Sequence, residues 1–199
     1  MCKGEKVRAV AQRRAEQSTQ VMIRATEELI ARGGLRAVTV AEVARIAGTS
    51  NGSLYHRFGD REGLLVAVQQ ATLSRLEDEA LAVMARAREQ EPDAAMRDAV
   101  RGALRLFGEY RSALRAFFVE GQEIAAFEER NATCLRLLSE AAEGLLVERL
   151  GVPAREAAAI YRVLFSVGAT RALFTEEQMR GERVDDDELE TVLVRLLSR

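Results

Sequence analysis

The chain has 199 residues and a mass of 22.0 kDa, the size of one large domain or two small ones. Its hydrophobic residues (48%) are enough to form a core, and its 29 basic and 31 acidic residues nearly cancel, which excludes a uniformly basic nucleic-acid coat and an acidic disordered tail. No apolar run is long enough to span a bilayer and the N-terminus lacks the apolar segment of a signal peptide, so we expect a cytoplasmic protein without membrane contact.

The charges are unevenly distributed along the chain. Residues 1–65 carry 11 Lys and Arg against 7 Asp and Glu, a net charge of +4, whereas residues 66–199 have a net charge of −6. Seven of the 14 glycines also lie in the first third. This asymmetry predicts two modules with different partners.

Helical periodicity runs through the whole chain, and only Pro92 and Pro153 interrupt it. No alternation typical of a β-strand extends beyond a few residues. The spacing predicts an all-α protein of about nine helices and no sheet. The apolar stripes lie in residues 22–30, 40–47, 54–58, 65–87, 96–110, 114–118, 135–150, 160–173 and 189–197.

Thr39, Ser50 and Asp60 are each placed to cap the N-terminus of a helix. Thr39 has Glu42 three residues later, which is the pattern of a capping box. The helix that begins after Thr39 has only about two turns and is ended by Gly48. Two short helices joined by a glycine-containing turn predict a helix-turn-helix.

The second of these helices has one apolar side and one polar side. Leu54 and Phe58 face inward, and the opposite side carries Asn51, Ser53, Tyr55, His56 and Arg57. The DNA major groove, about 12 Å wide, admits one helix, and side chains near the helix N-terminus read the base edges. Gly52 lets the backbone come close to DNA, and the unpaired N–H groups at the three helix starts can bind phosphates.

Four motifs then follow one another at fixed spacing over about 45 residues. They are Met22-x-x-Ala25-Thr26-x-x-Leu29-Ile30-x-x-x-Gly34, Thr39-Val40-x-x-Val43-Ala44-x-x-Ala47-Gly48, Ser50-x-Gly52-Ser53-Leu54-Tyr55-x-x-Phe58 and Asp60-Arg61-Glu62-x-Leu64-Leu65. This run resembles the DNA-binding domain of the TetR family of bacterial transcriptional repressors. The resemblance implies a helix-turn-helix domain over residues 14–65 and an effector-binding and dimerisation domain over residues 66–199.

The resemblance also implies which residues contact DNA. Thr39 and Arg61 would bind phosphates, and Ala41 departs from the basic residue that is common at its position. The full set of implied DNA contacts is Thr39, Ser50, Asn51, Gly52, Ser53, Tyr55, His56, Arg57 and Arg61. A homodimer would bind a palindromic operator, and an unidentified small-molecule effector in the second domain would release it. The basic residues within positions 3–14 add a further candidate contact, along or in the minor groove.

The second domain has two candidate sites. Aromatic and polar residues of its central helices could line the effector pocket, although residues at helical spacing are more often plain core. These are Phe107, Tyr110, Phe117, Phe118, Phe127, Asn131, Cys134, Tyr161 and Phe165. The segment from Ala154 to Phe174 is apolar on opposite sides, so one side could face a second subunit together with the last helix. The candidate interface consists of Ile160, Leu164, Val167, Gly168, Arg171, Leu189, Val192, Leu193 and Leu196.

Other interpretations of single features stay open. His56 is either an exposed or structural residue or a DNA contact, and Asp185–Glu188 is either a helix N-terminus or a cation site. Cys134 is expected to be a buried inert thiol. An enzyme is disfavoured because one histidine and no phosphate loop or metal-ligand pattern leave no catalytic or cofactor site. A helical protein–protein adaptor would leave the polar side of residues 51–57 without a role.

Overall fold

The structure, a computed structural model, describes residues 3–174, 176–179, 181 and 184–197. Within these residues it contains helices and no strand, which confirms the predicted all-α class. The ten α-helices are α1 (Lys3–Gly33), α2 (Val40–Ala47), α3 (Asn51–Phe58), α4 (Arg61–Arg88), α5 (Pro92–Glu109), α6 (Arg111–Arg115), α7 (Ala125–Leu150), α8 (Ala154–Leu173), α9 (Glu176–Met179) and α10 (Asp186–Leu197). A 3₁₀ turn, η1 (Leu35–Ala37), and a π-helical turn, η2 (Ala116–Glu120), complete the helical elements.

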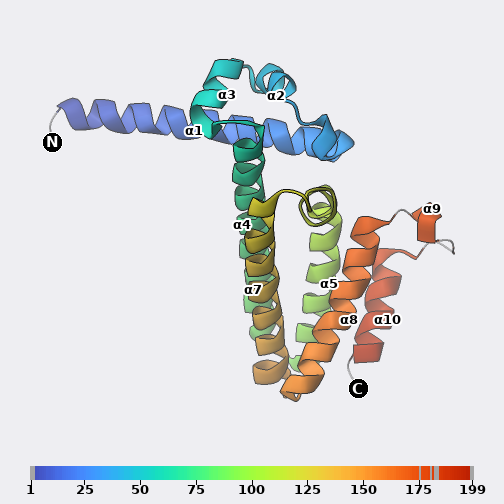
Figure 1. Cartoon of the computed structure of the whole chain (residues 1–199). Coiled ribbons are helices and arrows are strands. Elements are labelled where there is room, and N and C mark those ends of the chain that lie inside the picture. The colour runs from blue at the N-terminus through green and yellow to red at the C-terminus, as the bar shows by residue number, and fades with distance from the viewer. Residues whose placement is uncertain (1–2, 175, 180, 182–183, 198–199) are drawn as a thin grey trace.

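The helices form two parts that meet at the N-terminal end of α4 (Figure 1). There α1 lies crosswise over α4, α2 packs on α1, and α3 packs on α2 and on α4. Below this junction α4 and α7 lie side by side, and α5, α8 and α10 complete a bundle. The N-terminal helices are therefore carried on one end of the bundle.

The helix ends are largely set by local sequence, and the three predicted N-caps are confirmed. In each, the side chain of the cap residue accepts a hydrogen bond from a backbone N–H three residues later: Thr39 from Glu42, Ser50 from Ser53, and Asp60 from Gly63. Gly34 and Gly48 follow α1 and α2 with positive φ values of 68° and 62°, which an L-residue adopts only with strain. The two helices therefore end where the sequence predicts.

The acidic run Asp185–Glu188 forms the start of α10. The Glu188 N–H donates to Asp185 Oδ1 (2.8 Å), and the Asp185 N–H donates to Glu188 Oε2 (3.2 Å). This reciprocal pair is a capping box, and it places carboxylates where the helix dipole favours them. The helix-start interpretation of this run is confirmed.

Two helices begin earlier than the apolar periodicity predicts, and one was not predicted. The first helix begins at Lys3 and the seventh at Ala125, ten residues before the stripe at 135–150. In the ten residues added to α7 only Phe127 and Cys134 are buried, so the periodic signal is weak there. The short α9 has a single turn, which no periodicity can reveal.

One apolar core continues from the N-terminal helices into the bundle. Its buried members include Met22, Leu29, Val43, Leu54, Leu65, Phe117 and Phe127. At its edge the Glu27 carboxylate of α1 accepts a hydrogen bond from the Thr72 hydroxyl of α4 (2.6 Å) and pairs with Arg75. Packing and hydrogen bonding therefore both fix how α1 lies on α4.

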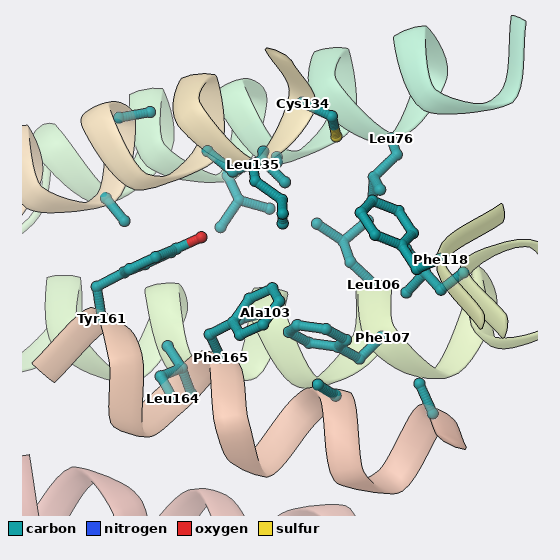
Figure 2. Close-up of a pocket in the computed structure, with 18 of the residues that line it drawn as sticks. Leu76, Ala103, Leu106, Phe107, Phe118, Cys134, Leu135, Tyr161, Leu164 and Phe165 are labelled. Carbon is teal, nitrogen blue, oxygen red and sulfur yellow. The ribbon is translucent and has the colours of Figure 1, made fainter. Parts of the chain in front are cut away.

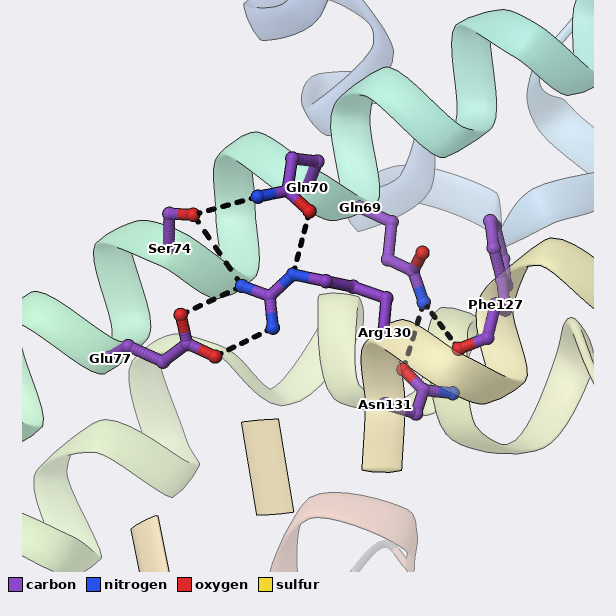
Figure 3. Close-up of polar contacts among 7 residues, drawn as sticks. All are labelled: Gln69, Gln70, Ser74, Glu77, Phe127, Arg130 and Asn131. Carbon is purple, nitrogen blue, oxygen red and sulfur yellow. Dashed lines mark hydrogen bonds and ion pairs between the residues drawn. The ribbon is translucent and has the colours of Figure 1, made fainter. Parts of the chain in front are cut away.

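A largely buried ion pair joins α4 to α7 (Figure 3). The Arg130 guanidinium binds both carboxylate oxygens of Glu77 at 2.6 and 2.8 Å, and its Nε donates to Gln70 Oε1 at 2.8 Å. The Arg130 and Glu77 side chains are only 14% and 13% exposed. The hydrogen bond with Glu77 raises the pKa of Arg130. The pair stays charged and is shielded from solvent.

A second polar group lies next to this pair in Figure 3. The Gln69 side chain, 1% exposed, donates from Nε2 to the Phe127 carbonyl (3.1 Å) and to Asn131 Oδ1 (2.9 Å). Asn131 Nδ2 donates in turn to the Phe117 carbonyl (2.9 Å). The two amides hold α4, η2 and the start of α7 together.

Replacing Arg130 should expose the cost of breaking the α4–α7 pair. Arg130→Leu leaves the Glu77 charge shielded and unpaired, so we expect the free energy of unfolding to fall by about 2–4 kcal/mol. Urea unfolding followed by circular dichroism measures this change. The matched control is Arg105→Leu, because the Arg105 pairs with Glu79 and Glu109 are exposed and worth about 0–1 kcal/mol. Equal losses in the two variants would contradict the assignment.

Candidate nucleic-acid interface and effector cavity

The exposed side of α3 is polar and its buried side is apolar. Leu54 is 2% exposed and packs into the core, whereas Tyr55 is 53% exposed. All of the predicted DNA-contact residues are exposed. They are Thr39, Ser50, Asn51, Gly52, Ser53, Tyr55, His56, Arg57 and Arg61. The α3 surface predicted from the sequence therefore faces solvent at the end of the molecule opposite the bundle (Figure 1).

Some side chains on this surface form hydrogen bonds within the protein and others do not. Ser50 and Ser53 are occupied, because their hydroxyl groups bond to each other (3.0 Å) and Ser50 also caps α3. Within the described part of the chain, no hydrogen bond or ion pair involves the side chains of Asn51, Tyr55 or His56. These three polar groups are available to a partner.

The two arginines of the predicted set bond to the chain itself. Arg57 donates to the Ala15 carbonyl (2.9 Å) and to the Thr19 hydroxyl, which ties α3 to α1. Arg61 donates from Nε to the Val38 carbonyl (2.7 Å) and from Nη2 to the Leu35 carbonyl (2.6 Å).

These bonds use two of the five guanidinium N–H groups of Arg61, and its contact with phosphate stays a prediction. The carbonyls of the short η1 turn have few donors of their own, so a nearby guanidinium satisfies them. Sequence spacing showed that Arg61 lies in the first turn of α4 but could not show that η1 folds back onto it.

A cavity of about 500 Å³ lies between α4, α5, α6, α7, α8 and η2 (Figure 2). Its lining is almost entirely aliphatic and aromatic. The lining residues are Leu76, Ala80, Val83, Met84, Ala103, Leu106, Phe107, Leu114, Phe118, Val119, Gln122, Cys134, Leu135, Leu138, Ala141, Ala142, Tyr161, Leu164, Phe165, Ala169, Ala172 and Leu173. The volume is within the range of about 300–1,000 Å³ typical of small-molecule sites.

Three polar side chains belong to this lining, and none of the lining residues is charged. They are Gln122, Cys134 and Tyr161. Figure 2 shows the Tyr161 hydroxyl pointing into the space between α8 and α7. Burial raises the pKa of Tyr161 to about 12 and that of Cys134 to about 12, so both groups are neutral at physiological pH.

The structure divides the nine predicted pocket residues into two groups. Phe107, Phe118, Cys134, Tyr161 and Phe165 line the cavity. Phe165 packs edge-on against Phe107 at 5.7 Å and lies 5.9 Å from Tyr161, measured between ring centroids. The aliphatic lining from α4 and α7 was missed, because leucines and alanines at helical spacing look the same whether they face a core or a cavity.

The other four predicted pocket residues are outside the lining. Phe117 and Phe127 pack edge-on against each other in the core at 5.5 Å, and Asn131 joins α7 to Gln69 and the Phe117 carbonyl. The Tyr110 hydroxyl donates to Glu79 (2.8 Å) on the outer side of α4. All four have their contacts within the structure rather than in the cavity.

The predicted dimer residues also divide. Ile160, Leu193 and Gly168 are buried inside this chain, and Leu164, Val167 and Leu189 are partly buried and pack against the same core. A Cβ on Gly168 would lie 2.1 Å from the Phe107 ring, so Gly168 permits close approach of α5 rather than of a second subunit. Arg171 pairs with Asp186 (2.6 Å) and joins α8 to α10.

Val192 and Leu196 remain exposed on α10, at 38% and 57%. Val163 of α8, exposed by 47%, was not among the predicted interface residues. All three are large apolar side chains that the described part of the chain leaves exposed.

Two kinds of site are not found in the described part of the chain. No helix there is both long enough and apolar enough to cross a membrane. No group of three or more His, Cys, Asp and Glu side chains there is arranged to hold a metal ion.

Residues 22–68 match the family model described as bacterial regulatory proteins, tetR family. The HTH-type transcriptional regulator BetI of Rhizobium meliloti is 38% identical over 65 residues, which are 33% of this chain and 32% of that protein. BetI of an Escherichia coli K12 strain is 42% identical over 60 residues, 30% of this chain and 31% of that protein. The match thus spans about a third of the length of these relatives.

Solved structures resemble the whole fold. A TetR-family transcriptional regulator from Mesorhizobium loti aligns with a TM-score of 0.78 at 19% identity, over 92% of this chain and 96% of that one. The regulator FadR from Bacillus subtilis, in complex with stearoyl-CoA, aligns with a TM-score of 0.66 at 17% identity, over 90% and 97% of the two chains. At these identities the likeness establishes the fold.

The Cys134 thiol should be almost unreactive in the folded protein. Burial raises its pKa from 9.0 to about 12, so the folded thiol stays protonated in a pH range where the unfolded thiol is ionised. In a Cys2→Ser variant we expect a disulfide reagent to label Cys134 at least about a hundredfold more slowly before unfolding than after it. Because the folded pKa is the higher one, this contribution to stability is complete below pH 9.0 and is lost as the pH rises towards about 12. Rapid labelling of the folded protein would contradict the burial.

Proposed function

We propose that the chain is a DNA-binding transcriptional repressor of the tetR family of bacterial regulatory proteins, whose model its residues 22–68 match. The observation that carries the proposal is the exposed polar side of α3, where no hydrogen bond from the described residues reaches the side chains of Asn51, Tyr55 and His56. In this role α3 lies in the major groove, where such side chains can bond to base edges and phosphates.

Electrostatics support the same surface. The net charge of +4 over residues 1–65 attracts the phosphate backbone, whereas the bundle is acidic overall. The N-termini of α2, α3 and α4 lie in the same domain and offer backbone N–H groups to phosphates. The N-terminal half of α1 extends past α3 in Figure 1, so the basic residues of positions 3–14 are candidates for additional DNA contact.

We propose that two copies of the chain bind one operator. The exposed apolar side chains Val163, Val192 and Leu196 would be covered by the same surface of a second subunit. A twofold dimer presents two α3 helices, which favours a palindromic operator with half-sites about one helical turn of DNA apart.

A small molecule in the bundle cavity would release the operator. The helix α4 serves both parts, since Leu64 and Leu65 belong to the N-terminal core and Leu76, Ala80 and Val83 line the cavity. The stearoyl-CoA complex of the Bacillus subtilis neighbour supports a ligand-binding role for a bundle of this fold. The coupling is reciprocal, so operator DNA must weaken effector binding by the same factor.

Substitution of Tyr55 tests the DNA interface. The purified protein is first used to select its bound sequences from random DNA, and Tyr55→Ala is then measured on the selected duplex. We expect affinity to fall at least tenfold, by about 1.4 kcal/mol, while sedimentation shows an unchanged oligomeric state and circular dichroism an unchanged fold. The control is Arg86→Ala, because Arg86 is exposed near the far end of α4.

The salt dependence gives an independent check. Wild-type affinity should fall steeply between low and moderate salt, as expected when several phosphates are neutralised. A protein that selects no sequence, or a Tyr55→Ala variant with wild-type affinity, would refute the assignment of α3 as the recognition helix.

A further inference from the structure

We propose that the cavity takes an elongated, uncharged and mainly hydrocarbon molecule with one hydrogen-bonding oxygen that meets the Tyr161 hydroxyl. The inference rests on the proposed function of the cavity as the effector site. Its basis is the composition of the lining, in which no side chain carries a charge.

The shape of the cavity favours an elongated ligand. The lining residues of α8 extend from Tyr161 to Leu173, which is about 18 Å at a helical rise of about 1.5 Å per residue. Those of α7 extend from Cys134 to Ala142 and those of α4 from Leu76 to Met84, about 12 Å each. The cavity therefore runs along the bundle rather than across it.

The chemistry of the lining excludes a charged group from the interior. A carboxylate or ammonium placed there would lose its hydration without a counter-charge, which costs several kcal/mol or forces it to become neutral. Arg130, which joins α4 to α7, is already occupied by Glu77 and Gln70. The cavity can therefore accommodate the whole of an uncharged ligand.

Tyr161 supplies the polar contact. Its hydroxyl points into the cavity and takes part in no hydrogen bond among the described residues, whereas the hydroxyl of Tyr110 is bonded to Glu79. Because no described residue bonds to this hydroxyl, a ligand oxygen placed here can form a hydrogen bond with it without displacing one inside the protein. An alcohol, ketone or ester oxygen meets this requirement.

Three ten-carbon probes test the ligand class on the purified protein without DNA. Isothermal titration calorimetry compares decan-1-ol, decanoate and decyltrimethylammonium, with thermal stabilisation as a second readout. We expect decan-1-ol to bind at least about tenfold more tightly than either ion. Equal or tighter binding of an ion, or binding of none of the three, would overturn the proposal.

Two tyrosine variants then test the polar contact. Tyr161→Phe should weaken decan-1-ol binding about two- to tenfold, and the matched control Tyr110→Phe should leave it unchanged. An unchanged affinity of Tyr161→Phe would overturn the role of this hydroxyl. Operator binding is measured in separate experiments. Failure to bind DNA there would count against the proposed function and not against the ligand class.

A second inference comes from a different observation, at the junction of the two parts. We infer that Glu120 is a positioning residue through which the cavity wall holds the η1 turn that leads into α2. Glu120 Oε2 accepts a hydrogen bond from the Leu35 N–H (2.8 Å), and its Oε1 accepts one from Arg115 Nε (3.2 Å). Arg115 also donates to the Leu173 carbonyl at the end of α8 (3.4 Å).

This chain of bonds meets the cavity wall at two places, next to Glu120 and at Leu173. Phe118 and Val119 line the cavity immediately before Glu120 in η2, and Leu173 lines it from α8. The contact with the N-terminal part is close, because a Cβ on Gly34 would lie 2.3 Å from Glu120 Oε2. A shift of η2 towards or away from an occupant of the cavity therefore moves the acceptor of the Leu35 N–H.

Amide hydrogen exchange of Leu35, resolved by NMR, tests this coupling. Glu120→Ala removes the acceptor, so we expect exchange at Leu35 to rise about tenfold, and the exposed control Glu123→Ala should leave it unchanged. Phe118→Ala alters the cavity wall beside Glu120 and should also raise exchange at Leu35. Amides of α5 serve as the reference for global unfolding.

The coupling is measured by combining the variants. In the Glu120→Ala background, Phe118→Ala should add no further increase at Leu35, and Leu138→Ala, on the α7 wall, should have no effect at Leu35 in either background. A Phe118→Ala effect of the same size in both backgrounds, or wild-type protection of Leu35 in Glu120→Ala, would overturn the inference.

Discussion

The packing of α1 across the first turns of α4 is the constraint on which the rest of the molecule depends. The buried side chain of Leu65 belongs to the core that α1, α2 and α3 share, and three turns later Leu76 belongs to the cavity wall. No break separates these positions, since α4 is one helix of 28 residues capped by Asp60. A displacement of either end of α4 must therefore be carried to the other, because helices move as rigid elements more readily than they bend.

The sequence predicts features that are decided locally. The caps at Thr39, Ser50 and Asp60 depend on a side chain and a backbone N–H three residues away, so the amino-acid type alone identifies them. The same holds for Gly48, which adopts the left-handed conformation at the end of α2. The polar side of α3 follows from helical periodicity once these ends are placed.

What the sequence cannot predict depends on contacts between distant segments. Arg61 has the residue type and the position of a phosphate contact, yet its guanidinium binds carbonyls more than twenty residues away. Phe117 and Phe118 are neighbours in the sequence, but the first lies in the core and the second lines the cavity. Gly121 allows this division, because a Cβ there would lie 2.6 Å from the Phe127 ring that packs on Phe117. No periodicity distinguishes such a core from a cavity.

The two walls of the cavity are held together by bonds of different strength. The α4–α7 wall has the shielded Arg130–Glu77 pair and the buried amide of Gln69, which are costly to separate. The opposite side depends on exposed Arg111 and Arg115, which donate to carbonyls at the end of α8. Bonds at exposed positions are replaced by water at little cost. An occupant that widens the cavity would therefore displace the end of α8 and η2 before it separates α4 from α7, and that side leads to the η1 turn and the helices that follow it.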